Sequence, residues 1–408
     1  MNFSRDRFAL FVSCVLLLGL LTACASSAAE PNVVQAPTAT ASAKIVVEAE
    51  TEMPATETAV STTMPESDAT ETTIPSPVPT DTPEAEVEET YLPSESVFTL
   101  VSTEPIIAHG PEEAWDSENI SAGPIVFHDG VYHMLQNALT GWPPSAGGTA
   151  YSTSEDGYSW NRIGDDSVFS AEDIDGKHVP FASAALVQPD GTWVMYFNTW
   201  PLRAVSHRTE IYRATAPTPS GPWTADREPV LKGGALGSWD AGGVGAPSVV
   251  QTEDGFVMYY TGGEFAQSKI GRATSSDGIH WEKYDDPTTT DRKYEESDPV
   301  LHPNEDVRAW DGGTTMNPDV IQTMDGWVMV YNSRASRGQR TGYALSEDGI
   351  VWQRSEAPII DIEEIPNSVG SFGPIIRFID GTYHLFVEIG GGGNTNVYLA
   401  THEGSLRP

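Results

Sequence analysis

Short runs in which apolar and polar positions alternate recur through residues 97–408, and an Asp-Gly step separates the two runs of each pair. An Asp-Gly step between strand-like runs predicts a β-hairpin, because glycine accepts a positive φ and aspartate tolerates a tight turn. The steps stand at Asp129-Gly130, Asp190-Gly191, Asp254-Gly255, Asp325-Gly326 and Asp380-Gly381. We therefore expect five hairpins, spaced 55 to 71 residues apart.

A second pattern, S-x-D-G-x-x-W, occurs at residues 154–160, 275–281 and 346–352. It predicts another turn, followed by a strand whose first residue, the Trp, has a large apolar face to bury. A third strand precedes the pattern, for example at 271–274. In the second unit, which lacks the pattern, residues 214–223 stand where the third strand and the turn are expected. Four antiparallel strands repeated five times are typical of an all-β, five-bladed propeller.

The fifth unit ends after residues 398–401 without an outer strand. Residues 98–107 are similar to residues 352–360, which hold the outer strand of the fourth unit. We therefore expect the N-terminal strand to pair into the last blade and close the ring, because closure removes an exposed sheet edge.

A Trp-Asp step precedes three of the inner strands, at Trp115-Asp116, Trp239-Asp240 and Trp310-Asp311. A residue that recurs in several repeats usually has one structural role in each of them. The repeat therefore favours an Asx-type loop cap beneath a packed Trp. A catalytic role for Asp240 or Asp311 is the alternative.

The 408-residue chain has 22 basic and 58 acidic residues, which gives a formal net charge of -36. Nucleic acids and anionic membrane surfaces would repel such a chain, so neither is an expected partner. Arg5 and Arg7 precede an apolar run at 8–21, and the sequence Leu-Thr-Ala-Cys ends at Cys24. This order predicts a secretory signal over residues 1–23 and resembles the bacterial lipobox, whose cysteine is acylated. We expect a lipid anchor at Cys24 and an extracellular or cell-surface domain.

Residues 24–96 are rich in Thr, Pro, Ala, Glu and Ser and poor in aromatic residues. Such a segment buries too little apolar surface to offset the entropy lost on ordering. We expect a disordered tether that separates the anchor from the domain at 97–408. Cys14 and Cys24 are the only cysteines, and both precede the domain, so the domain must fold without disulfides. We also expect a monomer.

The hairpins, the S-x-D-G-x-x-W turns, the run at 214–223 and the Tyr-Tyr-Thr-Gly run at 259–262 together resemble the furanosidase-type propellers of glycoside hydrolase families 43 and 32. These form the arabinanase, levansucrase and invertase superfamily, and the resemblance covers essentially all of 97–408. It implies a carbohydrate partner, a pocket at the mouth of the central channel, and hydrolysis by paired carboxylates.

The family's acidic residues stand just before inner-strand prolines, or two residues before one. In this chain the positions before the inner-strand prolines, with their equivalent in the second unit, are Gly123, Ser183, Ala246, Asn317 and Gly373. None is a carboxylate, so the family's catalytic residues cannot be carried over. Loops around the mouth must then supply the chemistry.

Glu264 and Glu388 follow the second strands of the third and fifth units, so we expect them to face each other across the mouth. One would protonate the leaving oxygen and the other would activate water or attack carbon, with Asp311 or Asp240 assisting. The alternative is that both are exposed loop residues. The candidate substrate-binding residues are Asn317, Asn332, Arg334, Asn198, Trp200, Trp142 and His178.

The indole and guanidinium side chains in and near this set indicate what kind of substrate it would bind. The indoles of Trp142 and Trp200 suit the C–H faces of sugar rings, with core or rim packing as the alternative. Arg334, Arg337 and Arg340 would suit an acidic sugar or a phosphate. No cluster has metal-ligand spacing, so no cofactor is expected, although an ion in the channel is left open.

The leading hypothesis is a lipid-anchored, cell-surface glycosidase. A carbohydrate-binding lipoprotein that has lost the family's acids is the rival, and a propeller that binds proteins through its rims is a third interpretation.

Overall fold

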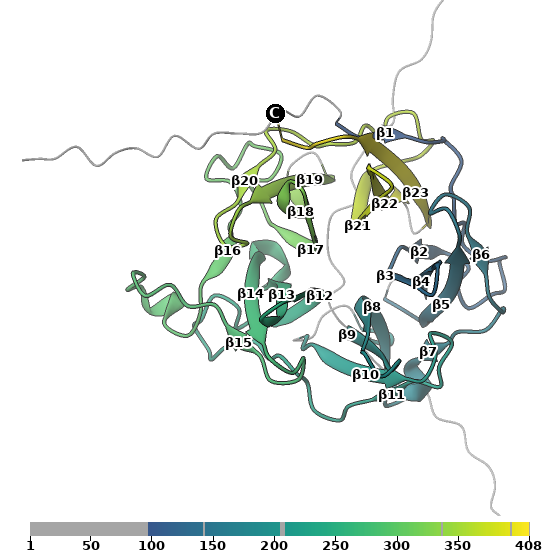
Figure 1. The fold of residues 1–408 in the computed structure, drawn as a ribbon, viewed down its shortest axis with the longest axis horizontal. Helices are drawn as coiled ribbons and strands as arrows, with labels where there is room; N and C mark the ends of the chain where they lie inside the picture. Colours follow the sequence, from purple (N-terminus) through teal and green to yellow (C-terminus); the bar gives the residue numbers. More distant parts are fainter. Residues whose placement is uncertain (1–96, 142, 205–208, 336–337, 392–393, 408) are drawn as a thin grey trace, which may run out of the picture. The chain divides into compact units, whose positions relative to one another are not determined.

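The computed structural model describes residues 97–407, except 142, 205–208, 336–337 and 392–393. This part of the chain is all-β apart from three short 3₁₀ helices, η1 (Ala171–Asp173), η2 (Phe265–Gln267) and η3 (Arg292–Tyr294). Its sheets surround a common centre in a β-propeller-like arrangement (Figure 1). No helix in the described residues is long and apolar enough to span a membrane. The predicted signal peptide, Cys24 and the tether lie outside these residues.

Hydrogen bonding groups the strands into four sheets of ten, four, five and four strands, and the ten-stranded sheet comprises two antiparallel sets, one and five (Figure 1). Set one contains β2 (Asn119–Ser121), β3 (Ile125–His128), β4 (Val131–Thr140), β5 (Ala146–Ser154), β6 (Asn161–Arg162) and β7 (Phe169–Ser170). Set two contains β8 (His178–Val187), β9 (Trp193–Pro201), β10 (Tyr212–Ala216) and β11 (Thr224–Ala225). Set three contains β12 (Val244–Thr252), β13 (Gly255–Gly262), β14 (Lys269–Ser275), β15 (Glu282–Lys283) and β16 (Pro299–Leu301).

Set four contains β17 (Met316–Thr323), β18 (Gly326–Ala335), β19 (Gly338–Ser346) and β20 (Gln353–Arg354). Set five contains β21 (Gly370–Ile379), β22 (Thr382–Gly391), β23 (Asn394–Glu403) and the N-terminal β1 (Thr99–Leu100). β1 lies antiparallel to β23, with Thr99 opposite Thr401, as the N-terminal repeat predicts. One parallel bridge, Asn119 to Thr395, joins sets five and one.

The five predicted Asp-Gly hairpins are present. Each joins the first two long strands of a set, and the glycine of each turn has a positive φ. A positive φ costs a residue with a Cβ about 1 kcal/mol or more, which is why glycine occupies these positions.

The S-x-D-G-x-x-W motif forms a turn that is held by its own side chains. In the copy at 346–352, the Ser346 hydroxyl accepts from the backbone N–H of Gly349 at 2.9 Å. The Asp348 carboxylate accepts from the N–H groups of Ile350 and Val351 at 2.8 and 2.9 Å. The same bonds recur in the other two copies.

The Trp that ends each motif packs against the preceding set. Trp352 meets the buried Tyr259 edge-on, with ring centroids 5.6 Å apart and planes at 83°. Trp281 meets Tyr196 and Trp160 meets Phe386 in the same way. The motif is therefore a joint between neighbouring sets as well as a hairpin.

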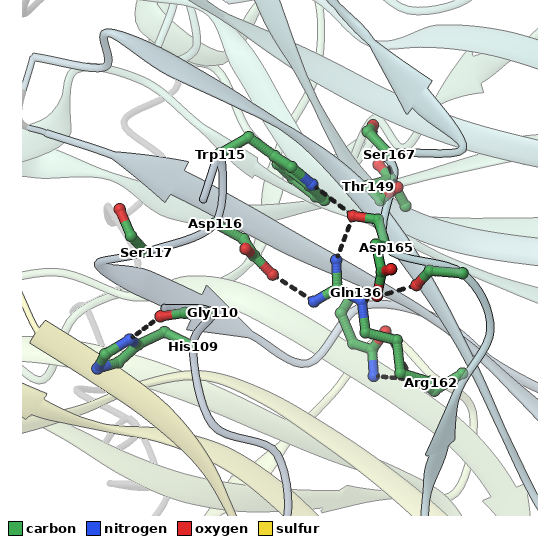
Figure 2. A network of polar contacts seen from close by, with 12 residues as sticks. His109, Gly110, Trp115, Asp116, Ser117, Gln136, Thr149, Arg162, Asp165 and Ser167 are labelled. Carbon is green, nitrogen blue, oxygen red and sulfur yellow. Dashed lines mark hydrogen bonds and ion pairs between the residues drawn. The ribbon is translucent and has the colours of Figure 1, made fainter. Parts of the chain in front are cut away.

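The Trp-Asp repeat ties the loop before the inner strands to the outer strand. Figure 2 shows the first copy, in which Arg162 of β6 pairs with the buried Asp116. The Arg162 guanidinium also lies 5.6 Å from the centre of the Trp115 ring, whose Nε1 donates to the carbonyl of Asp165 at 3.0 Å. The other copies pair Asp240 with Lys283 at 2.5 Å and Asp311 with Arg354 at 3.1 Å.

Candidate functional site

A β-bulge interrupts the pairing of the inner strands at the positions expected to surround the channel mouth. The register of set three shifts between Gly245 and Ser248, and that of set four between Met316 and Asp319. Ala246, Asn317 and Gly373 lie at such shifts with φ values of 45°, 52° and 43°. A bulge turns its side chains away from the regular alternation of the strand, so these positions form a distinct layer.

Beside this layer, each second strand carries one polar residue that contacts the inner strand of the next set. The Asn137 amide both donates to and accepts from the backbone of Ala182, at 2.7 and 2.8 Å. Asn198 accepts from the N–H of Ala246 at 3.0 Å. These side chains act as latches between neighbouring sets.

The same position in sets three and four continues the series. The Thr261 hydroxyl accepts from the N–H of Asn317 at 2.8 Å. The Asn332 amide donates to the carbonyl of Ser371 at 3.1 Å and to the hydroxyl of Thr341 at 3.0 Å.

These latches change the interpretation of two candidate substrate-binding residues. Asn198 and Asn332 are buried, and their amides are used between sets. The sequence pattern predicts loops at both positions, but Asn198 lies in β9 opposite Phe181 and Asn332 lies in β18 opposite Thr341, because strand pairing continues beyond the apolar runs. These contacts favour a structural role between sets, and substrate contact by the two residues stays a prediction.

Glu388 occupies the same position in set five and is the one acid of this series. The hydroxyls of Ser121 and Thr395, from sets one and five, lie near its carboxyl group and act to lower its pKa. The residue keeps some solvent exposure, but its carboxyl end is enclosed by protein. A Cβ built on Gly373 would lie 3.8 Å from its Oε2. Glu388 thus lies beside the inner-strand bulge at Gly373.

Burial raises the pKa of Glu388 to about 7, although its two hydroxyl partners favour the charged form. A carboxyl group with a pKa near neutrality can both hold and release a proton at physiological pH. This is the property that the acid of a glycosidase needs.

Glu264, the other member of the predicted pair, is exposed and stands at the N-terminus of η2, where its side chain caps no backbone N–H. It lies close to Gly242, whose added Cβ would come within 2.8 Å of the Glu264 Cγ. The two glutamates therefore differ in environment, one enclosed and one in solvent.

Asp240 and Asp311 are fully buried in ion pairs with outer-strand cations. Asp240 also accepts from the N–H of Gly234 at 3.0 Å, which is the loop cap that the repeat predicts. These contacts favour the structural interpretation over the catalytic one.

The remaining candidates occupy several positions. The His178 Nδ1 lies 2.6 Å from the Asp175 carboxylate. Trp200 is half-buried on β9, and Arg334 is exposed on β18. The Asn317 amide donates to the Asn332 carbonyl oxygen at 3.4 Å. Trp142 lies outside the described residues, as does Arg337.

The buried acid Asp319 is absent from the site residues predicted from the sequence. Asp319 accepts from the Ser248 hydroxyl at 3.1 Å and pairs with Arg377 at 2.7 Å. Arg377 in turn donates to the carbonyl of Ile125 at 2.8 Å. This chain of contacts joins inner strands of sets three, four, five and one. An acid among the apolar residues of an inner strand was the available signal.

No group of three or more His, Cys, Asp or Glu side chains in the described part of the chain could hold a metal ion.

No protein-family model matches the chain. Over 191 residues it is 29% identical to two uncharacterized proteins of Mycobacterium tuberculosis, MT1551 and Rv1502. The match covers 44% of this chain and 58% of each relative, so the chain spans little more than half of their length.

Solved structures give broader coverage. A glycosyl hydrolase from Bacteroides ovatus matches with a TM-score of 0.55 and 19% identity, over 77% of this chain and 96% of that one. A structure from the GH130 family of mannoside phosphorylases matches with a TM-score of 0.56 and 19% identity, over 79% of this chain and 99% of that one. That family is described as containing glycoside hydrolases that target β-1,2 mannosidic linkages in Candida mannan.

A thermostable family-43 glycoside hydrolase matches with a TM-score of 0.51 and 16% identity, over 71% of this chain and 91% of that one. At these identities the likeness concerns the fold. The described domain thus has the propeller-like fold of glycoside hydrolases, including those of families 43 and 130, and the resemblance inferred from the sequence is confirmed at that level.

Proposed function

We propose that this protein is a cell-surface lipoprotein that hydrolyses glycosidic bonds of an extracellular oligo- or polysaccharide. The observation that carries the proposal is Glu388, an enclosed carboxyl group with a pKa of about 7 beside the inner-strand bulge at Gly373 of a glycosidase-like fold. The other four latch positions need only a neutral hydrogen-bonding group, so an acid at the fifth calls for a chemical reason.

In this proposal the strand sets are the blades of a five-bladed propeller, closed by β1 on β23. Glu388 protonates the leaving oxygen, and Ser121 and Thr395 hold its carboxyl group in position. Glu264, which is exposed, supplies the carboxylate that activates water or attacks carbon. The lipobox-like sequence at Cys24 would anchor the domain outside the cell.

The rival function, carbohydrate binding without hydrolysis, is favoured by one specific observation. Four equivalent latches at Asn137, Asn198, Thr261 and Asn332 are structural, so Glu388 could be a fifth latch.

The test compares Glu388→Gln and Glu264→Gln with wild type on a panel of neutral and acidic oligosaccharides. If the protein is a hydrolase, each variant loses at least about 100-fold in kcat while its melting temperature does not fall below that of wild type. Glu347→Gln, an exposed change in a turn, serves as the control. Binding of a sugar by wild type without any hydrolysis would favour the rival function.

A further inference from the structure

Three basic side chains gather at one end of set three. In the β14–β16 pair Ile270 lies opposite Leu301, which brings Lys269 beside His302. Lys293 belongs to η3, and its Nζ lies 5.8 Å from the centre of the Tyr294 ring. That ring meets His302 edge-on at 6.1 Å. We refer to Lys269, Lys293 and His302 as the basic cluster.

The basic cluster lacks the acidic partners that other cations of this fold have. Lys283 pairs with Asp240 and Arg354 with Asp311, but within the described residues no carboxylate lies at ion-pair distance from any member of the cluster. The chain as a whole has a net charge of -36, so acids were available to pair with it.

Its members also repel one another. Partial burial and the positive charge of Lys293 lower the pKa of Lys269. Asp298 is the nearby acid that acts on His302, and its carboxylate already accepts from the N–H of Asp286 at 2.8 Å. Like charges held together at a half-buried surface destabilise the empty protein, and a bound anion would remove that cost.

We propose that the basic cluster binds an oxyanion, either a carboxylate or a phosphate. Two ammonium groups offer positive charge and N–H donors, and the imidazole offers a further N–H donor. Together they come from three separate segments, which suits a multivalent acceptor.

The place of the cluster indicates how the anion is delivered. Lys269 pairs with Gly262 on β13, two residues before Glu264, so the cluster borders the loop that carries Glu264. An acidic substituent of a glycan that reaches this loop would bind there, as would free inorganic phosphate. The glycan source rests on the proposed function, whereas anion binding itself does not.

Isothermal titration calorimetry of the full domain tests the proposal with three probes: inorganic phosphate, a trigalacturonate, and its neutral methyl ester. We expect wild type to bind at least one of the two anions, and the neutral ester at least about tenfold more weakly than trigalacturonate if the glycan is the source. Phosphate binding alone would identify the free ion as the source.

The variants are Lys269→Gln, Lys293→Gln and their combination, with Lys232→Gln as the matched control. Lys232 is an exposed lysine whose ion pair with Glu228 is unrelated to the cluster. Each cluster variant should lose at least about tenfold in anion affinity, and Lys232→Gln none. Their melting temperatures without anion should equal or exceed that of wild type, because repulsion is relieved.

Binding of neither anion by wild type, or equal loss in Lys232→Gln, would overturn the proposal. Glu388→Gln should keep anion binding. If wild type binds an anion but hydrolyses no oligosaccharide, the proposed function is overturned and the proposal of anion binding at the basic cluster is supported.

Discussion

The Asp311 carboxylate accepts a hydrogen bond from the guanidinium of Arg354 at 3.1 Å, although 43 residues separate the two in the chain. Only 1% of the Asp311 side chain and 11% of the Arg354 side chain are exposed. The pair joins the loop before β17 to β20, and Asp311 also accepts from the Tyr331 hydroxyl at 3.1 Å. It shows how one side chain of a repeated motif holds a strand set together.

Asp311→Asn should lower the free energy of unfolding by about 3 kcal/mol, because it leaves the Arg354 charge buried without its partner. Urea denaturation followed by tryptophan fluorescence measures the change. Glu347→Gln removes a carboxylate from an exposed pair with Arg407 and should leave stability unchanged within error. Equal effects of the two substitutions would show that burial of the Asp311 pair contributes nothing.

Trp352→Ala should lower the free energy of unfolding by about 2 kcal/mol, because the half-buried indole packs edge-on against Tyr259 of the preceding set. The Tyr259 hydroxyl also donates to the Gly349 carbonyl at 2.8 Å in the same turn. Thermal unfolding should show a smaller loss for Trp352→Phe and almost none for the neighbouring Val351→Ala, whose side chain is 73% exposed. A neutral Trp352→Ala would mean that the joint between sets three and four does not depend on this ring.

Asn332→Asp should make stability depend on pH. The Asn332 amide donates to the carbonyls of Arg340 and Ser371, so an ionised carboxylate there would face two acceptors. This raises the folded-state pKa of the new Asp above its unfolded value of about 3.9. Stability is therefore kept below pH 4 and is lost as pH rises through the folded pKa. Melting temperatures of the Asn332→Asp variant between pH 3.5 and 8 measure this loss of stability. Asn332→Ala is the control, and its melting temperature should show no such pH dependence.

The raised pKa of Glu388 has consequences for stability and for activity. Its folded-state value of about 7 exceeds its ordinary value of 4.5, so its stabilising contribution is complete below pH 4.5 and is lost as pH rises to 7. Glu388→Gln should therefore gain melting temperature relative to wild type over that range. If Glu388 is the proton donor, wild-type kcat/KM should fall tenfold per pH unit above pH 7. Parallel melting curves of the two proteins at every pH would contradict the enclosed position of Glu388.

Much of the local structure follows from short sequence patterns. Asp-Gly steps and S-x-D-G-x-x-W turns are held by their own side chains and by glycines with positive φ, so they need no partner from elsewhere in the chain. The periodic return of these turns also predicts the repeated strand sets, and the similarity of residues 98–107 to 352–360 predicts the pairing of β1 with β23. The cations that pair with the Trp-Asp repeat also occupy a regular position in the sequence, because Arg162, Lys283 and Arg354 each stand two residues after a turn Trp.

What only the tertiary structure decided is how the polar residues around the channel are used. Asn198 and Asn332 are indistinguishable from substrate ligands in the sequence, but in the fold their amides meet the backbone of the next set. Glu388 and Glu264 are likewise two loop-like glutamates until packing encloses one and leaves the other in solvent. The physical reason is that the hydrogen-bond partners of such residues come from the next set, 39 to 48 residues away for Asn137, Asn198 and Asn332, which a local pattern cannot specify.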